Sequence, residues 1–331
     1  MIERKVRRDK IIRRKEFVSA LLGIAASVFL AAVLFLYFND RYLHIGAVPS
    51  TYDVIRFFCG GARPYTELSD GEISVSFIDV GQGDCELISV NGCNILIDCG
   101  DTDKIDSVIG FLKYSGVEQV NMVIITHPHD DHYGGMYKLL QHFDIGEVIM
   151  PEIEVQSVTY QRLNKVINDR DIRFRYAKAG ERLTLGEDIF LDIIAPIYFD
   201  YSEENNFSIV ARLVYGETSF LFTGDLERAG ELDLIEAGLD LRADVLKVGH
   251  HGSAGSSSAE FLQRVSPKIA VFEAGAINYY GHPRSEVLDR LAEAGCEEAY
   301  STAANGNVVI ISDGKELRLM TEKEKAYSFI E

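Results

Sequence analysis

The sequence predicts one α/β domain, with helices packed outside two sheets, behind a single N-terminal transmembrane helix. Residues 73–97 contain three short apolar stretches that read as strands. The last two are joined by Asn91-Gly92, a dipeptide typical of tight hairpins. From about residue 105 onward, stretches with helical and strand periodicity alternate as far as residue 312. This alternation favours helices that cover sheets within one domain.

The predicted transmembrane helix is the uncharged run of residues 17–38. At about 1.5 Å per residue it would reach about 33 Å, enough to cross a bilayer core of about 30 Å. Residues 1–16 carry eight Lys or Arg against three acids. The positive flank predicts a cytoplasmic N-terminus and an extracytoplasmic domain in a single-pass cell-membrane protein. A cleaved signal peptide is the alternative, but its apolar core would be only about 7–15 residues long.

Breaks in the sequence pattern give the domain boundaries. Residues 1–16 form a basic cytoplasmic tail, 17–38 the span, 39–72 a juxtamembrane linker, 73–315 the α/β domain and 316–331 a C-terminal tail. The total charge of −18 minus the +5 of the tail leaves −23 for the remainder, which counts against broad electrostatic attraction to nucleic acid. The five cysteines form no C-x-x-C pair and are expected to be mostly core thiols: Cys59, Cys85, Cys93, Cys99 and Cys296.

Candidate metal ligands gather in "ITHPHDDHYGG", residues 125–135. His127 and His129 lie two apart just after an apolar strand, so both imidazoles leave the backbone on the same side and can share one cation. Asp131 and His132 form a second pair. Nitrogen and carboxylate donors without thiolate suit Zn²⁺, with Mn²⁺ or Fe as alternatives. A lone histidine would more often be an ordinary turn residue, but four donors at this spacing predict a metal site.

Two distant stretches also end an apolar strand in metal donors. "SFLFTGD" ends in Asp225, and "DVLKVGHHGS" contains His250 and His251. Taken alone, Asp225 would be a helix N-cap. As a member of this set it is predicted to bridge two metals, because an acid at a buried strand end needs a partner that neutralises it.

The order H-x-H-x-D-H, then "FTGD", then a strand-end histidine resembles the metallo-β-lactamase fold superfamily. Five further stretches narrow the resemblance to the extracytoplasmic hydrolase domain of ComEC-type late-competence DNA-uptake proteins, over Ile73 to Asp313. They are "FIDVGQGDCELI", "NILIDCGD", "NNFSIVARLVYG", "LKVGHHGSAGSSS" and "NYYGHPRSEVLDRL". The multi-spanning channel region of those proteins has no counterpart in this chain.

The resemblance implies an αββα sandwich with two divalent cations at the sheet edges. One cation would lie on His127 and His129, and the other on Asp131 and His132, with Asp225 between them. Either His250 or His251 would complete the second site, and the other would face the substrate. No further histidine occurs between His142 and Asp225, where many superfamily members have one. Asn206 and Ser208 of "NNFS" are therefore candidate substrate contacts or weak metal contacts.

Two cations about 3.5–4 Å apart can hold a hydroxide that attacks phosphorus or a carbonyl carbon. Asp131 would orient or deprotonate this nucleophile. His282 would contact phosphate or protonate the leaving oxygen, unless it is an ordinary turn residue. Ser253 and residues 256–258 could seat a phosphate or simply cap the following helix. Asp79 and Asp84 are expected to shape a turn beside the metals, and Asp98 to orient a ligand histidine.

The sequence therefore favours a membrane-anchored, metal-dependent phosphodiesterase or nuclease, with DNA as a candidate substrate. The alternatives are hydrolysis of another phosphoester, such as a wall-polymer phosphorylcholine ester, hydrolysis of a lactam, or a non-catalytic metal-binding module. A long groove with Lys247, Arg212 or Arg284 along it would favour a DNA strand. Protein partners and oligomeric state are not predicted.

Overall fold

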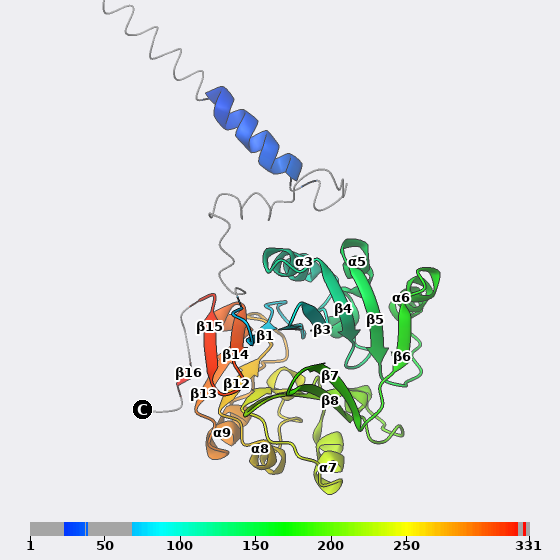
Figure 1. Cartoon of the computed structure of the whole chain (residues 1–331), viewed down its shortest axis with the longest axis vertical. Helices are drawn as coiled ribbons and strands as arrows, with labels where there is room; N and C mark the ends of the chain where they lie inside the picture. The colour runs from blue at the N-terminus through cyan, green and yellow to red at the C-terminus, as the bar shows by residue number, and fades with distance from the viewer. Residues whose placement is uncertain (1–22, 37, 39–67, 324–326, 329–331) are drawn as a thin grey trace, which may run out of the picture. The chain divides into compact units, whose positions relative to one another are not determined.

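The computed structural model describes residues 23–36, 38, 68–323 and 327–328 (Figure 1). The chain divides into two units, residues 1–63 and 64–331. Residues 23–36 are helical. Within the described part of the chain, no helix is both long enough and apolar enough to span a membrane. The predicted tail 1–16, most of the linker 39–72 and part of the span 17–38 lie outside the described residues.

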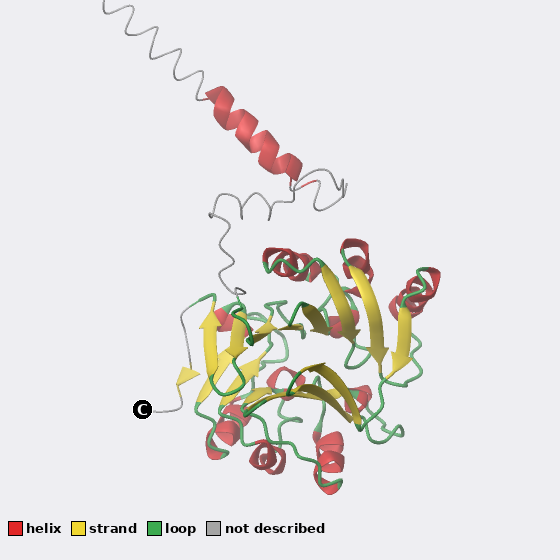
Figure 2. Ribbon diagram, in the orientation of Figure 1, coloured by secondary structure: helices red, strands yellow, loops and turns green. Residues whose placement is uncertain are grey.

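The second unit is built on two eight-stranded sheets that face each other (Figures 1 and 2). The first sheet has the order β15 (Leu317–Thr321), β14 (Val308–Ser312), β1 (Ile73–Phe77), β2 (Glu86–Val90), β3 (Cys93–Ile97), β4 (Gln119–Ile124), β5 (Asp144–Met150) and β6 (Arg173–Tyr176). The second has the order β16 (Tyr327–Ser328), β13 (Glu298–Ser301), β12 (Ile269–Phe272), β11 (Val245–Lys247), β10 (Thr218–Phe222), β9 (Val210–Tyr215), β8 (Ile189–Ala195) and β7 (Glu181–Gly186).

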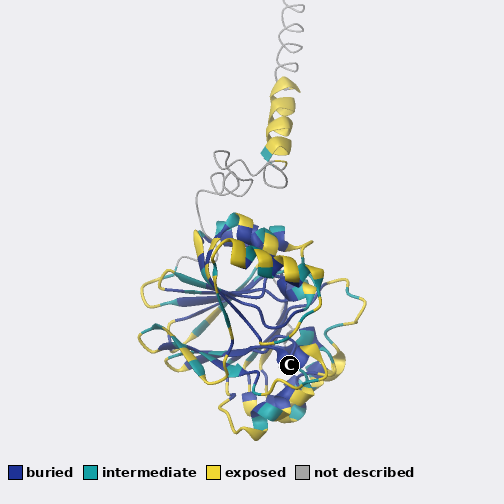
Figure 3. Ribbon diagram, turned by 90° about the vertical axis from the view of Figure 1, so that its right-hand side faces the viewer, coloured by how far each residue is buried: buried dark blue, intermediate teal, exposed yellow. Residues whose placement is uncertain are grey.

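Helices cover the outer faces of both sheets (Figure 1). The first sheet carries α3 (Ile105–Tyr114), α5 (Met136–His142) and α6 (Val158–Asp169), and the second carries α7 (Arg228–Glu236), α8 (Ala259–Val265) and α9 (Ser285–Glu293). Three apolar cores result: one under each helical layer and one between the sheets. Phe77 and Phe222 meet across the central core with ring centroids 6.3 Å apart, and the strands that face each other are mainly coloured as buried in Figure 3. The predicted αββα sandwich is confirmed.

Parallel pairing brings the carboxyl ends of several strands to one edge of the sandwich. Strands β3, β4, β5 and β6 pair in parallel in the first sheet, as do β10, β11, β12 and β13 in the second. The segments that follow these strands therefore leave from the same edge. Ligands bind most often at this edge of parallel α/β sheets.

The predicted C-terminal tail, residues 316–331, contributes two strands to the sheets. Strand β15 pairs with β14 over its whole length, and β16 pairs with β13. Leu317 and Leu319 pack on the central core, while Arg318 between them forms an ion pair with Glu72, 3.3 Å apart. This period-2 alternation of apolar and charged side chains stabilises an edge strand.

Candidate metal centre

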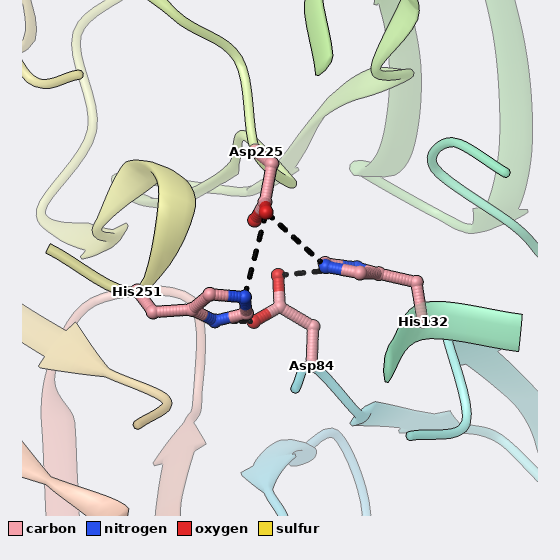
Figure 4. Close-up of side chains that lie close together, drawn as sticks. All are labelled: Asp84, His132, Asp225 and His251. Carbon is pink, nitrogen blue, oxygen red and sulfur yellow. Dashed lines mark ion pairs between the residues drawn. The ribbon is translucent and has the colours of Figure 1, made fainter. Parts of the chain in front are cut away.

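The predicted donor residues meet at the shared strand edge of the two sheets. His127 to His132 follow β4, Asp225 follows β10, and the His250-His251 pair follows β11. Their donor atoms form two groups that share Asp225: one with His127 and His129, the other with His132, His251 and Asp84. Within each group the donor atoms lie within 4.8 Å of one another. Figure 4 shows the second group.

The first group is close enough to share one cation. His127 Nε2 lies 3.0 Å from His129 Nδ1 and 3.9 Å from Asp225 Oδ2. Burial, reinforced by the His132 imidazole, holds the pKa of His127 well below its ordinary value. The His127 ring therefore keeps a free lone pair at neutral pH. His129 is partly exposed, and its Nε2 lies 3.2 Å from Glu204.

In the second group, several buried donor atoms have no hydrogen-bond partner. The Nε2 atoms of His132 and His251 each lie 3.4 Å from Asp225 Oδ2, and His251 Nε2 lies 3.3 Å from Asp131 Oδ2. Neither Nε2 atom nor Asp225 Oδ1 has a hydrogen-bond partner, although all three are buried. Buried polar atoms are rarely left unpaired. Two imidazole nitrogens and two carboxylates that face one point suit a divalent cation.

The opposite edges of the two imidazole rings are held by the protein. Asp98 Oδ2 lies 2.7 Å from His132 Nδ1, as predicted for an acid that orients a histidine, and Asp98 also accepts hydrogen bonds from Thr126. The Glu273 carbonyl oxygen lies 2.8 Å from His251 Nδ1. These contacts put the Nδ1 proton on the protein side and turn both Nε2 atoms toward Asp225.

Asp84 also lies on the Nδ1 side of both rings. Its carboxylate oxygens are 3.1 Å from His251 Nδ1 and 3.7 Å from His132 Nδ1. A cation on the Nε2 side would therefore be held by His132, His251, Asp225 and Asp131, with Asp84 behind the rings. Asp84 thus orients these histidines instead of coordinating with them.

The charges of the centre are strongly coupled. Burial opposes ionisation of Asp225, yet the His251 and His132 imidazoles outweigh it and hold the pKa of Asp225 well below its ordinary range. Asp131 behaves in the same way: burial is outweighed by His132 and His251, and its pKa is lowered. The carboxylates are therefore ionised. Although burial opposes it, Asp225 and its neighbouring acids raise the pKa of His132 and His251, so that these rings carry the balancing positive charge in the metal-free protein. Divalent cations supply such charge in a site of this kind.

The structure distinguishes the two adjacent histidines. Both have left-handed backbone angles, φ 48° for His250 and φ 54° for His251, which turn their side chains in different directions. His251 is buried in the second donor group. His250 is partly exposed, with Nε2 3.6 Å from Asp225 Oδ2 and Nδ1 3.2 Å from Glu227. His251 therefore fits the metal position, and His250 lies at the rim.

His282 lies beside the centre, as the predicted role requires. Its ring centroid is 5.7 Å from that of His250 and 6.4 Å from that of His251, and the ring stacks on Tyr280. Burial, then the charges of His251 and His250, lower the pKa of His282 to about 4. His282 Nδ1 is buried without a hydrogen-bond partner.

In the predicted phosphate seat, residues 256–258, two backbone N–H groups already bind a protein carboxylate. The backbone N–H groups of Ser257 and Ser258 donate to Glu231, and the Ser258 side chain caps α8. These groups therefore serve the helix start, which was the alternative interpretation of the serine run. Ser253 is partly exposed at the end of the His250-His251 segment.

Asn206 and Ser208, the predicted contacts to substrate or metal, accept hydrogen bonds from backbone N–H groups near Asp225. Both side chains are buried. Ser208 Oγ accepts a hydrogen bond from the Asp225 N–H at 3.1 Å. Asn206 Oδ1 accepts from the N–H groups of Glu227 at 3.2 Å and Gly230 at 3.1 Å, at the start of α7. Together they hold the segment that carries Asp225.

Replacing Asn206 by alanine is expected to lower the free energy of unfolding by about 1–3 kcal/mol, because two backbone N–H groups lose their acceptor. Urea denaturation of metal-free protein measures the change. Asn168→Ala, at an exposed position near the end of α6, serves as the control and should stay within about 0.5 kcal/mol of the parent. Equal destabilisation by both substitutions would contradict the positioning role of Asn206.

Of the three cations that would favour a DNA strand if they lay along a groove, two are engaged with other groups of the protein. Lys247 is fully buried, and its ammonium group contacts Asp84 and the Gly224 carbonyl oxygen. Arg212 donates to the Arg242 carbonyl and pairs with Asp240. Arg284 remains exposed near His282. The sequence reveals Lys247 only as a lysine at the end of an apolar strand, so its buried partner could not be identified.

The domain that carries this centre is similar to known proteins. Residues 78–275 match the family model described as "Metallo-beta-lactamase superfamily". ComE operon protein 3 of Bacillus subtilis is 32% identical over 67% of this chain and 31% of its own length. Competence protein ComA of Neisseria gonorrhoeae is 28% identical, over 68% of this chain and 30% of its own.

Recombination protein 2 of Haemophilus influenzae is 30% identical over 76% of this chain and 30% of its own length. The chain thus spans about a third of the length of these curated relatives. The resemblance to competence proteins inferred from the motifs is confirmed over the hydrolase domain.

Proposed function

Because the chain belongs to the metallo-β-lactamase superfamily and is a metal-dependent hydrolase, we propose that it is a phosphodiesterase that uses two divalent cations. The observation that carries the proposal is the pair of donor groups that share Asp225. His127 and His129 would hold one cation; Asp131, His132 and His251 would hold the other. Zn²⁺ suits these donors best, and Mn²⁺ is the alternative.

When bound, the cations supply an activated water and stabilise negative charge on the phosphoryl oxygens. The protein supplies the proton transfers and the positions of the reacting groups. Asp131, partly exposed beside the second donor group, orients or deprotonates the attacking water. Burial keeps the His282 ring neutral at neutral pH, so at the rim it donates a hydrogen bond to the phosphate or to the leaving oxygen, and His250 faces the substrate.

DNA is the substrate that we favour, because the chain is similar to proteins that are named for competence and recombination. The net charge of −18 argues against long-range attraction of a polyanion, so binding must rest on local contacts. The uncharged run 17–38 and its basic flank support a single-pass anchor that places the hydrolase outside the cell membrane.

The proposed function predicts two equivalents of bound metal and turnover of bis-p-nitrophenyl phosphate by the purified chain. Asp131→Asn should lower turnover about 10²–10⁴-fold, because it removes the group that handles the proton of water. The adjacent Asp130, which is exposed, gives the matched control Asp130→Asn, which should keep parental turnover. Elemental analysis and phosphodiesterase assays measure both quantities.

Single-stranded DNA, double-stranded DNA, a phosphorylcholine ester and a lactam complete the substrate panel. Metal-replete protein that hydrolyses only the lactam or only the phosphorylcholine ester would replace the proposed substrate class. Failure to hydrolyse any of these compounds would exclude the enzymatic proposal and favour a metal-binding module.

A further inference from the structure

An aromatic pocket lies along the same sheet edge as the candidate metal centre. It has a volume of about 810 Å³, and Phe174, Tyr176 and Phe199 are among the side chains that line it. Tyr176 ends β6, two strands from β4, and Phe199 follows β8, two strands from β10. Neighbouring strands lie about 4.8 Å apart, so a separation of two strands places the pocket roughly 10 Å from the metal centre along each sheet.

One continuous segment connects this pocket to the metal centre. In residues 196–207, Phe199 lines the pocket, and Glu204 further along contacts His129, 3.2 Å away. Asn205 next to it donates to Glu227, which itself lies 3.2 Å from His250. The pocket and the metal centre are therefore lined by one continuous segment of the chain.

A second group of exposed rings lies on the other side of the centre, in the loop of residues 275–284 after β12. Tyr279 is fully exposed and Tyr280 is 67% exposed. Tyr280 stacks on His282, with ring centroids 5.5 Å apart and planes 22° apart, and His282 lies against His250. We call Tyr279 and Tyr280 the tyrosine pair.

The loop that carries the tyrosine pair is internally held. Asn278 Nδ2 donates to the carbonyl oxygens of Gly275 and His282, both at 2.8 Å, and Asn278 Oδ1 accepts from the His282 N–H at 2.9 Å. The exposed rings are thus presented on an ordered loop in contact with the centre, where they can stack on a ligand without large loss of conformational entropy.

We propose that the aromatic pocket and the tyrosine pair stack unpaired nucleobases on either side of the scissile phosphate, so that the enzyme selects a single strand. This inference rests on the proposed phosphodiesterase function. Base–aromatic stacking is tolerant of sequence and contributes strongly to the binding of single strands. In a duplex the bases are stacked on one another and cannot reach these rings. In so acidic a protein, stacking supplies the affinity that net charge does not.

The ligand that suits the aromatic pocket and the tyrosine pair is a nucleobase and not a quaternary ammonium group. Aromatic cages can hold choline, but a site of that kind gains from acids that are free to face the cation. Two acids line the pocket, Glu152 and Glu181; Glu181 is paired with Arg175 at 2.7 Å, and the lining Lys178 would repel a quaternary ammonium group. Aromatic rings also lie on both sides of the centre, which is a longer binding surface than a small phosphoester would cover.

The test measures binding of a fluorescein-labelled thymidine 12-mer by anisotropy, in EDTA so that no cleavage occurs. An abasic 12-mer with the same phosphates and a 12-base-pair duplex are the comparisons. The parent should bind the thymidine strand at least tenfold more tightly than either comparison. Tyr279→Ala and Phe199→Ala should each weaken binding of the thymidine strand by about tenfold and leave binding of the abasic strand unchanged.

Tyr137→Ala is the matched control, because Tyr137 is an exposed tyrosine on the outer helix α5 that packs against Arg162. It should bind all three ligands like the parent. Thermal melting of each variant, expected within a few degrees of the parent, shows that these surface substitutions leave the fold intact.

Equal affinity of the parent for the thymidine and abasic strands would overturn the stacking site, as would tighter binding of the duplex or displacement of the strand by phosphorylcholine at equal concentration. If the parent hydrolyses bis-p-nitrophenyl phosphate under these outcomes, the proposed function stands and only the stacking inference fails. Base-dependent binding without hydrolysis of any phosphodiester would support the stacking site and exclude the phosphodiesterase.

Discussion

Replacing Asp225 by asparagine is expected to lower phosphodiester hydrolysis by roughly 10³-fold or more and to remove at least one of two bound metal equivalents. Asp225 Oδ2 lies within 3.9 Å of a ring nitrogen of four histidines: His127, His132, His250 and His251. No other carboxylate belongs to both histidine-containing donor groups among the described residues. An amide keeps the shape of Asp225 but loses the negative charge that a pair of cations requires.

Elemental analysis and the bis-p-nitrophenyl phosphate assay check this expectation together. Glu236→Gln removes one charge from an exposed position of α7 and should change neither quantity. Retention of both metal equivalents with turnover within threefold of the parent would show that Asp225 does not join the two sites. Loss of metal in both variants would instead point to a general charge effect.

The donor residues could be predicted from the sequence, because the spacing of residues at a strand end determines the side on which each side chain leaves the backbone. His127 and His129 follow one strand at an interval of two, and Asp225 and His251 end two other apolar strands that pair in parallel. Parallel pairing then brings these ends together without further information. The choice between His250 and His251 depends on two consecutive left-handed backbone conformations, which residue type alone does not specify.

The contacts behind the donors could not be predicted, because they join residues far apart in the chain. Lys247 and Asp84 are separated by 163 positions, and Cys85 N–H reaches Glu273 across 188. Such pairs form only when the two sheets face each other. The pairing of β7 with β8 is weakly marked in the sequence, because a register shift between Thr184 and Gly186 breaks the alternation at the end of β7.

Lys247→Met is expected to lower the free energy of unfolding by about 3–5 kcal/mol, because it leaves the buried Asp84 carboxylate without its cation. Near Asp84, burial followed by the Asp84 charge raises the pKa of the buried Glu273 to about 8, so Glu273 is largely neutral at pH 7 and Asp84 carries the charge that Lys247 balances. Lys247 also donates to the Gly224 carbonyl at 3.2 Å, directly before Asp225. It therefore links the carboxylate behind His251 to the segment that carries Asp225.

A second Lys–Asp pair, at the residues directly before β11 and β12, provides the control. Lys268 and Asp244 lie 2.8 Å apart, but the Lys268 side chain is 63% exposed, so Lys268→Met should cost less than about 1 kcal/mol. Urea denaturation of metal-free protein compares the two variants. A difference of less than 1 kcal/mol between them would show that the buried pair contributes no more than the exposed one.

The double variant Lys247→Met/Asp84→Asn separates loss of a cation from loss of packing. Without the Asp84 charge the methionine faces no unpaired carboxylate, so the double variant should be more stable than Lys247→Met alone. Its metal affinity should nevertheless fall about 10–100-fold below the parent, measured by competition with a chelator, because Asp84 also lies 3.1 Å from His251 Nδ1. Recovered stability with reduced metal affinity identifies Lys247 as the counter-charge of a carboxylate that positions metal ligands. Equal stability of the single and double variants would reduce Lys247 to a space-filling residue of the core.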